Sequence, residues 1–282
     1  MQGMVCLVTG ANVGVGLETA RGLAQRGATV VLACRDRAKA QAAAEDIRAS
    51  TGNQAVEVLD LDLASLASVR AAADRFLAQH DRLDVLVNNA GLILSGRSET
   101  VDGFETQLGV NHLGHFLLTN LLLDVLTRRA PARVVTLSSA GHALSLGLDF
   151  DDLMYTRRRY WDVRVYCDSK LANVLFTKEL ARRLDGTGVV AHAVHPGVVR
   201  SSFAGDGDTT GIFKWGAKLT SWASLSPARG ARTSLHVATS EEAGTCTGAY
   251  WASARRTTPS RRARDAEAAQ TLWTISAALV GL

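Results

Sequence analysis

Short runs of apolar, β-branched residues alternate with longer helical stretches along most of the 282-residue chain. Most of the short runs are apolar throughout, as expected of strands that are covered on both faces. This strand–helix alternation predicts a doubly wound α/β fold, a parallel Rossmann sheet of about seven strands with right-handed crossovers and helices on both faces. We expect strands at 4–9, 29–34, 55–61, 83–88, 133–138, 189–195 and near 248–251, and helices at about 15–26, 37–49, 66–79, 105–127, 165–184 and 227–239.

The composition fits one globular domain. With 47% hydrophobic and 21% charged residues the chain is neither disordered nor collagen-like, and with 4 prolines it has no proline-rich linker. We expect a single domain over 1–282, with insertions on the substrate side near 141–161 and 203–225. Each insertion is either part of a substrate cleft or a packed surface excursion. The aromatic residues of the second, such as Trp215, favour a lid over an apolar substrate.

Charge and cysteine usage exclude several other classes. Much of the net charge of +4 comes from arginines at 157–159 and 255–264, and neither cluster is interleaved with aromatic residues, which favours solvated loops over a nucleic-acid surface. The four cysteines form no Cys-x-x-Cys pair, and the histidines, which we interpret as packed or loop residues, have no metal-ligand spacing. No stretch reads as a signal peptide or a membrane span. We therefore expect a cytoplasmic protein with reducible thiols and no metal, membrane or nucleic-acid partner.

A glycine-rich turn, 9–16, follows the first strand and precedes the first helix. Its glycines allow a tight turn and let the backbone approach a pyrophosphate, which the amide groups and dipole at the start of a helix attract. The position between a strand and a helix favours a dinucleotide site over a turn without a ligand. We expect the cofactor to contact Gly10, Asn12, Val13, Gly14, Val15 and Gly16.

The end of the second strand predicts which dinucleotide binds. It reads Cys34-Arg35-Asp36, at the place where NAD-binding proteins present a carboxylate to the ribose hydroxyls. The planar guanidinium of Arg35 can bind a 2′-phosphate, which favours NADP(H) over NAD. Asp36 is the alternative, because it could accept the ribose hydroxyls if the strand ends one residue later.

Tyr166 and Lys170 are spaced four residues apart in a predicted helix, so they lie on one face. An ammonium near a phenol stabilises the phenolate and lowers its pKa from about 10, as a proton donor to a carbonyl needs near neutral pH. The alternative is a tyrosine and a lysine that only share a helix face. The other motifs favour the catalytic interpretation.

Five motifs in order resemble the short-chain dehydrogenase/reductase family. They are Thr-Gly-x-x-x-Gly-x-Gly at 9–16, Asn-Asn-Ala-Gly at 88–91, Ser-Ser at 138–139, Tyr-x-x-x-Lys at 166–170 and Pro-Gly at 196–197. Longer segments, including Asn-His-Leu-Gly-His-Phe at 111–116, are similar to the retinol dehydrogenase and WW-domain oxidoreductase branch. Members of that branch often carry an amino-terminal membrane anchor, which we do not expect here.

The resemblance implies a role for each matching residue. Tyr166 would be the general acid/base, and Lys170 would lower its pKa and hold the nicotinamide ribose. Ser139 would bond the substrate carbonyl oxygen, with Ser138 as the alternative, and Asn111 would position Lys170 and a water for proton relay. Asp62 would accept the adenine amino group, and the further cofactor contacts would be Leu63, Asn88, Ala90, Gly91, Pro196, Gly197, Val198, Val199 and Ser201.

The sequence thus predicts an NADP(H)-dependent oxidoreductase that acts on a small, apolar substrate. It would interconvert a carbonyl group, either an aldehyde or a ketone, with the corresponding alcohol. A catalytically silent NADP-binding sensor or scaffold is one alternative, although such a protein would need none of the four catalytic residues. A specialised pigment or polyketide reductase is another. The resemblance also implies a homodimer or homotetramer, paired through the helices at 105–127 and 165–184.

Overall fold

An eight-stranded sheet forms the centre of the computed structural model, which describes residues 1–197 and 225–282. The strand order is β3-β2-β1-β4-β5-β6-β7-β8, and all neighbours are parallel except β7 and β8, which are antiparallel. The order reverses between β1 and β4, where a doubly wound sheet opens its ligand crevice. The strands are β1 (Val5–Thr9), β2 (Thr29–Cys34), β3 (Val56–Asp60), β4 (Val85–Asn88), β5 (Ala132–Leu137), β6 (Val189–His195), β7 (Tyr250–Ala252) and β8 (Arg255–Thr257).

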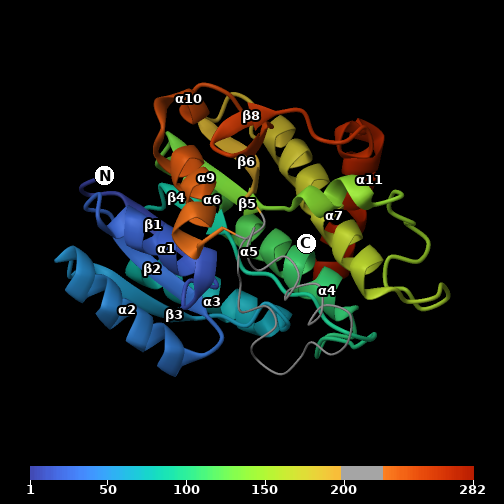
Figure 1. The fold of residues 1–282 in the computed structure, drawn as a ribbon, viewed down its shortest axis with the longest axis horizontal. Coiled ribbons are helices and arrows are strands. Elements are labelled where there is room, and N and C mark those ends of the chain that lie inside the picture. The colour runs from blue at the N-terminus through green and yellow to red at the C-terminus, as the bar shows by residue number, and fades with distance from the viewer. Residues whose placement is uncertain (198–224) are drawn as a thin grey trace.

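Helices cover both faces of the sheet, as Figure 1 shows, so the predicted α/β fold is confirmed. On one side pack α1 (Gly14–Ala24), α2 (Arg37–Thr51) and α9 (Pro227–Thr239), followed by α10 (Glu241–Gly244). On the other side pack α3 (Leu66–Gln79), α5 (Gly114–Leu121), α6 (Leu123–Arg128) and α7 (Asp162–Arg183), with α11 (Ala266–Val280) on top of α7 and α5. Shorter elements are α4 (Thr106–Leu108), the π-helix η1 (Gly109–Leu113) and the 3₁₀ turns η2 (Ala140–Leu144) and η4 (Arg262–Arg264).

The first strand shows why its sequence is apolar throughout. Cys6 and Val8 belong to the core on the side of α1, whereas Val5 and Leu7 belong to the core on the side of α3 and α5. Successive side chains of a strand point to opposite faces, so a strand covered on both faces has no polar side.

The single helix predicted over 105–127 is wrong, because the segment is divided into α4, η1, α5 and α6. The buried carboxylate of Glu105 starts α4 by accepting hydrogen bonds from the amides of Gln107 (2.8 Å) and Leu108 (2.7 Å). One π-helical turn then follows, closed by the Gly114 amide on the Gly109 carbonyl. A π-turn shifts the register of the side chains and is found most often at functional sites.

The sequence predicted neither β8 nor α11. Arg255 and Arg256 lie in β8, and Arg262 and Arg264 lie in η4, so these arginines are not in a loop, although all four are exposed as predicted. Trp273 of α11 packs against the rings of Phe116 (4.8 Å between centroids) and Phe176 (5.9 Å). The helix therefore covers part of α5 and α7, which belong to the helical stretches that we expected to pair subunits.

The described residues include no group of three or more His, Cys, Asp or Glu side chains placed to hold a metal ion. Within the same ranges no helix combines the length and apolar character needed to cross a bilayer. All four cysteines are free thiols.

Candidate active site

The glycine turn lies between β1 and α1, as predicted. Gly10 and Gly14 have positive φ angles of 63° and 62°, and a Cβ on Gly16 would lie 2.4 Å from the Gly10 carbonyl oxygen. Val13 precedes α1 and provides no side-chain cap, so no side chain of this residue competes for the first amides of the helix. This backbone-lined cradle, with its uncapped helix start, fits a pyrophosphate held by Gly10, Asn12, Val13, Gly14, Val15 and Gly16.

The turn after β4 is bound to the glycine turn. Asn89 donates from Nδ2 to the Thr9 carbonyl oxygen (2.7 Å), and the amides of Asn89 and Ala90 both donate to Thr9 Oγ1 (2.9 Å each). A Cβ on Gly91 would lie 3.1 Å from Lys170 Nζ and 3.2 Å from Asn111 Oδ1. The backbone at this glycine therefore passes between two of the predicted catalytic side chains.

Asn88 departs from its predicted role. Its side chain is buried and donates from Nδ2 to Thr119 Oγ1 (2.9 Å), so it points into the interior and does not face the glycine turn. Asn89, the next residue of the same motif, provides the side chain on the turn instead. The reason is the strand period of two, which sends consecutive residues to opposite faces.

Ser139, Tyr166 and Lys170 come together at the carboxyl end of β5. The Ser139 side chain interacts with the Tyr166 hydroxyl, and its Oγ accepts from the Gly141 amide (3.1 Å). Lys170 Nζ lies 5.6 Å from the centroid of the Tyr166 ring. Ser138, the alternative to Ser139, is buried and donates to the Lys170 carbonyl oxygen (2.8 Å). Ser139 is therefore the serine that faces the phenol.

The electrostatics of this group differ from the prediction. Burial raises the pKa of Tyr166 and outweighs the opposing interaction with Ser139, so the predicted lowering of that pKa is wrong for the protein alone. Burial also lowers the pKa of Lys170 to about 8, and its Nζ donates to the Leu137 carbonyl oxygen at 3.4 Å. Both shifts have the same cause, the cost of keeping a charge away from water.

Asn111 lies in the π-turn η1 and joins two other elements. Its Oδ1 accepts from the Leu92 amide (2.8 Å), and its Nδ2 donates to the Leu92 carbonyl oxygen (2.9 Å) and to Ser169 Oγ (3.0 Å). Ser169 in turn donates to the Tyr166 carbonyl oxygen (2.8 Å). The side chain thus fixes the chain beyond Gly91 to the turn of α7 that carries the tyrosine.

The remaining predicted cofactor contacts lie at strand ends. Arg35 follows β2 and is exposed, and Asp36 caps α2 by accepting from the Lys39 amide (3.0 Å). After β3, Asp62 accepts from the Ala64 amide (3.0 Å), and Leu63 is buried. Pro196 and Gly197 follow β6. The expected contacts of Val198, Val199 and Ser201, and the lid predicted over 203–225 except Leu225, lie outside the described residues.

The first insertion, 141–161, is packed against the helices beside the site. The buried carboxylate of Asp168 accepts from Ser145 Oγ (2.5 Å) and from the Tyr155 hydroxyl. Tyr160 donates to Glu105 Oε1 (2.8 Å) at the start of α4. Of the two alternatives for this segment, these bonds favour a packed excursion.

The comparisons with known proteins decide the family. A family model described as short chain dehydrogenase matches residues 4–148. The chain belongs to the short-chain dehydrogenase/reductase family. This oxidoreductase is 49% identical to retinol dehydrogenase 12 of Mus musculus, over 99% of its own length and 87% of that protein. It is 47% identical to retinol dehydrogenase 13 of Homo sapiens, with 99% and 85% covered.

Solved structures agree with this assignment. An uncharacterized protein from Mycobacterium Paratuberculosis superimposes on the present chain with a TM-score of 0.81 and 40% identity. The match covers 99% of this chain and 94% of that one. Pseudomonas aeruginosa RhlG, in an NADP active-site complex, gives a TM-score of 0.71 and 25% identity, over 89% and 95%. The predicted likeness to retinol dehydrogenases is confirmed.

The sequence did not reveal the hydrogen-bonding roles of four residues around this short-chain dehydrogenase/reductase site: Thr9, Asn89, His115 and Ser169. Each acts through hydrogen bonds between segments far apart in the chain, as the bonds of Thr9 to Asn89 and Ala90 show. Only His115 carried a usable signal, because it lies four residues after Asn111 and hence on the same side of a helix.

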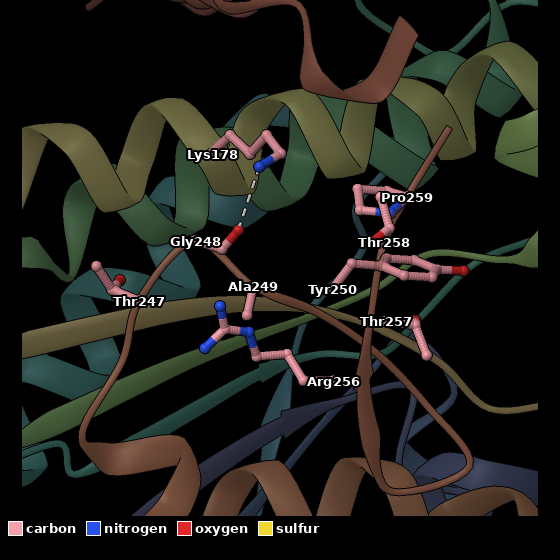
Figure 2. Close-up of a pocket in the computed structure, with 9 residues that line it drawn as sticks. All are labelled: Lys178, Thr247, Gly248, Ala249, Tyr250, Arg256, Thr257, Thr258 and Pro259. Carbon is pink, nitrogen blue, oxygen red and sulfur yellow. Dashed lines mark hydrogen bonds between the residues drawn. The ribbon is translucent and has the colours of Figure 1, made fainter. Parts of the chain in front are cut away.

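A separate recess of about 290 Å³ lies between α7 and the β7–β8 hairpin, away from these residues. Figure 2 shows Lys178 on one side, donating to the Gly248 carbonyl oxygen (3.4 Å), and Arg256 on the other. None of the predicted site residues lines it.

Proposed function

We propose that this short-chain dehydrogenase/reductase uses NADP(H) to interconvert a carbonyl and an alcohol on a small, apolar substrate. The observation that carries the proposal is that the Ser139 side chain faces the Tyr166 hydroxyl, with Lys170 Nζ 5.6 Å from the centroid of the tyrosine ring. Two hydroxyl donors side by side, next to an ammonium, suit an oxygen atom that gains negative charge.

The chain's own groups divide the work between them. A bound nicotinamide supplies or accepts the hydride. Because burial raises its pKa, Tyr166 holds its proton at neutral pH and can donate it to a substrate oxygen. Ser139 provides the second hydrogen bond to that oxygen, and Lys170 stabilises the phenolate left behind. Asn111, through Ser169, keeps the tyrosine in place.

The choice of NADP rests on the residues after β2. The Asp36 carboxylate is already engaged as the cap of α2, accepting from the Lys39 amide at 3.0 Å. Arg35 is exposed at the end of the strand, where a 2′-phosphate would lie. The NADP complex of the related RhlG supports the same choice. The pyrophosphate would be held at 10–16, and the adenosine by Asp62, Leu63, Ala90 and Gly91.

Replacing Tyr166 by Phe tests the chemistry. The variant keeps the ring and loses the transferable proton, so we expect kcat for carbonyl reduction to fall by at least about 100-fold. NADPH affinity should not change. The measurement is NADPH absorbance across a panel of aldehydes and ketones of graded size.

Near-normal turnover in Tyr166→Phe would refute the mechanism. A wild-type chain that binds NADPH and reduces nothing in the panel would favour the sensor or scaffold instead.

Replacing Arg35 by Ala tests the cofactor. Loss of a charge-assisted hydrogen bond should weaken NADPH binding by about 1.5–3 kcal/mol and leave NADH binding nearly unchanged. The matched control is Arg37→Ala, which removes a nearby arginine paired with Asp60 at 2.8 Å. Equal wild-type affinity for NADH and NADPH would contradict the assignment.

A further inference from the structure

His115, in the first turn of α5, is buried and has a partner on each ring nitrogen. Its Nδ1 lies 3.2 Å from the Asn111 carbonyl oxygen, and its Nε2 lies 2.9 Å from Thr9 Oγ1. The first partner belongs to the π-turn beside α7. The second ends β1, next to the glycine turn. One imidazole thus spans the predicted cofactor turn and a predicted catalytic residue.

The partners fix the direction of every hydrogen bond. A carbonyl oxygen only accepts, so the proton of His115 is on Nδ1. Burial lowers the pKa of His115 to about 3, so the ring is neutral and Nε2 accepts the hydroxyl hydrogen of Thr9. That hydroxyl has one hydrogen, and the Val87 carbonyl oxygen is more distant, at 3.4 Å. Each hydrogen bond of the chain therefore points the same way. The amides of 89 and 90 donate to Thr9, Thr9 donates to His115, and His115 donates to the Asn111 carbonyl oxygen.

Asn111 passes the constraint on to the tyrosine. Its side chain bonds to Leu92 on both amide atoms and to Ser169, which bonds to the Tyr166 carbonyl oxygen. A shift of the Asn111 backbone would therefore move either the chain beyond Gly91 or the turn of α7. Buried, fully satisfied networks of this kind resist such shifts, because any broken bond leaves an unpaired polar group.

We propose that His115 is a positioning residue that couples the cofactor turn, through Thr9, to Asn111 and Tyr166. The proposal rests on the proposed function, because it assumes that Asn111 and Tyr166 serve turnover. It assigns a different task to each nitrogen. Nε2 holds the turn that would bind the cofactor, and Nδ1 holds the residue that keeps the tyrosine in place.

Two substitutions separate the tasks. In His115→Asn the short amide can donate to the carbonyl four residues earlier, as Asn120 does to Phe116 in the same helix (2.8 Å), but it does not reach Thr9. In His115→Gln the longer amide can place its oxygen where Nε2 accepts from Thr9, at the expense of the bond to Asn111.

The two variants should differ in what they impair. For His115→Asn we expect Kd for NADPH, followed by tryptophan fluorescence without substrate, to rise about 5–30-fold, while kcat stays within about threefold of wild type. For His115→Gln we expect the reverse, a fall in kcat of about 5–30-fold with Kd within about threefold. Saturating NADPH and the best aldehyde of the panel are used for kcat.

The matched control is His112→Gln. His112 is also buried, lies three residues earlier, and bonds through Nε2 to Ser276 Oγ of α11 (2.8 Å), not to the cofactor turn. This variant should change the unfolding midpoint, without the selective change in Kd alone or in kcat alone that we expect of the two His115 variants. If His115 had only a structural role, both of its variants would also change the unfolding midpoint and show no selective change in Kd or kcat. That result would overturn the proposal.

The outcomes for the two proposals are distinct. If wild type binds NADPH but reduces no carbonyl, the proposed function fails. The affinity measurement on His115→Asn still decides the link to Thr9 in that case, because it needs no turnover. Unchanged Kd in that variant would disprove the link whether or not the wild type is active.

Discussion

The Lys170 ammonium is buried, and burial lowers its pKa from 10.5 to about 8. Loss of this charge removes the group that would stabilise the Tyr166 phenolate. We therefore expect kcat/KM for carbonyl reduction, at saturating NADPH, to fall about tenfold per pH unit above pH 8. A pH–rate profile from 6 to 10 measures this.

Stability should respond in the opposite direction. The folded chain binds fewer protons than the unfolded chain between the two pKa values, so the contribution of Lys170 to the free energy of unfolding rises from pH 8 to 10.5.

The matched control for the pH–rate profile is Lys178→Met, which lies in the same helix but away from the site and should show the same decline in kcat/KM above pH 8. A profile that stays flat to pH 10 would contradict the role of Lys170.

Single residues show what a sequence can and cannot reveal about a site. The motifs predicted which serine, tyrosine and lysine lie together, because each motif follows a strand whose carboxyl end meets the others at one edge of the sheet. They did not predict that Asn88 points inward, since a strand reverses its faces at every residue. The Thr9–His115–Asn111 network was also beyond reach, because its bonds join residues that only the fold brings together.

At the scale of elements, the predicted bounds agree with the observed ones where one apolar pattern runs through the whole helix or strand. β2, α3, β6 and α9 have the predicted bounds, since their apolar periodicity is uninterrupted. The segment 105–127 also has the apolar period of one long helix. Glu105 and the π-turn nevertheless divide it, and no residue propensity signals a π-turn. β8 has three exposed residues and pairs at the edge of the sheet, so it lacks the apolar pattern by which strands are recognised.

The packing of α11 yields a prediction about stability. Trp273 is 8% exposed and contacts the rings of Phe116 and Phe176, with the Arg183 guanidinium 4.4 Å from its ring centroid. Trp273→Ala should lower the free energy of unfolding by about 3–5 kcal/mol, because it leaves a cavity that these rings cannot fill. Urea unfolding measures the change.

The control for this variant is Trp161→Ala, whose side chain is 55% exposed. Loss of an exposed tryptophan should cost less than about 1 kcal/mol, including its contact with Arg159. Equal losses in the two variants would mean that α11 is not anchored by its tryptophan.

For the whole molecule, the position of α11 bears on assembly. The family resemblance predicted pairing through the helices at 105–127 and 165–184, yet the chain's own α11 packs on α5 and α7, with His112 bonded to Ser276 at 2.8 Å. We expect light scattering after size exclusion to give the mass of a monomer. A dimer whose cross-links join α5 or α7 of two subunits would contradict this.

Helix α11 also bears on the order in which these contacts can form during synthesis. The Arg70 guanidinium donates to the Val280 carbonyl oxygen (2.6 Å), across 210 residues of chain. The residues of β1 to β6 and of α7 leave the ribosome before those of α11, because synthesis runs from the amino terminus. Until Trp273 leaves the ribosome, the faces of Phe116 and Phe176 stay open to water, to chaperones and to neighbouring nascent chains. Synthesis must therefore pass Trp273 before the ring contacts with Phe116 and Phe176 can close.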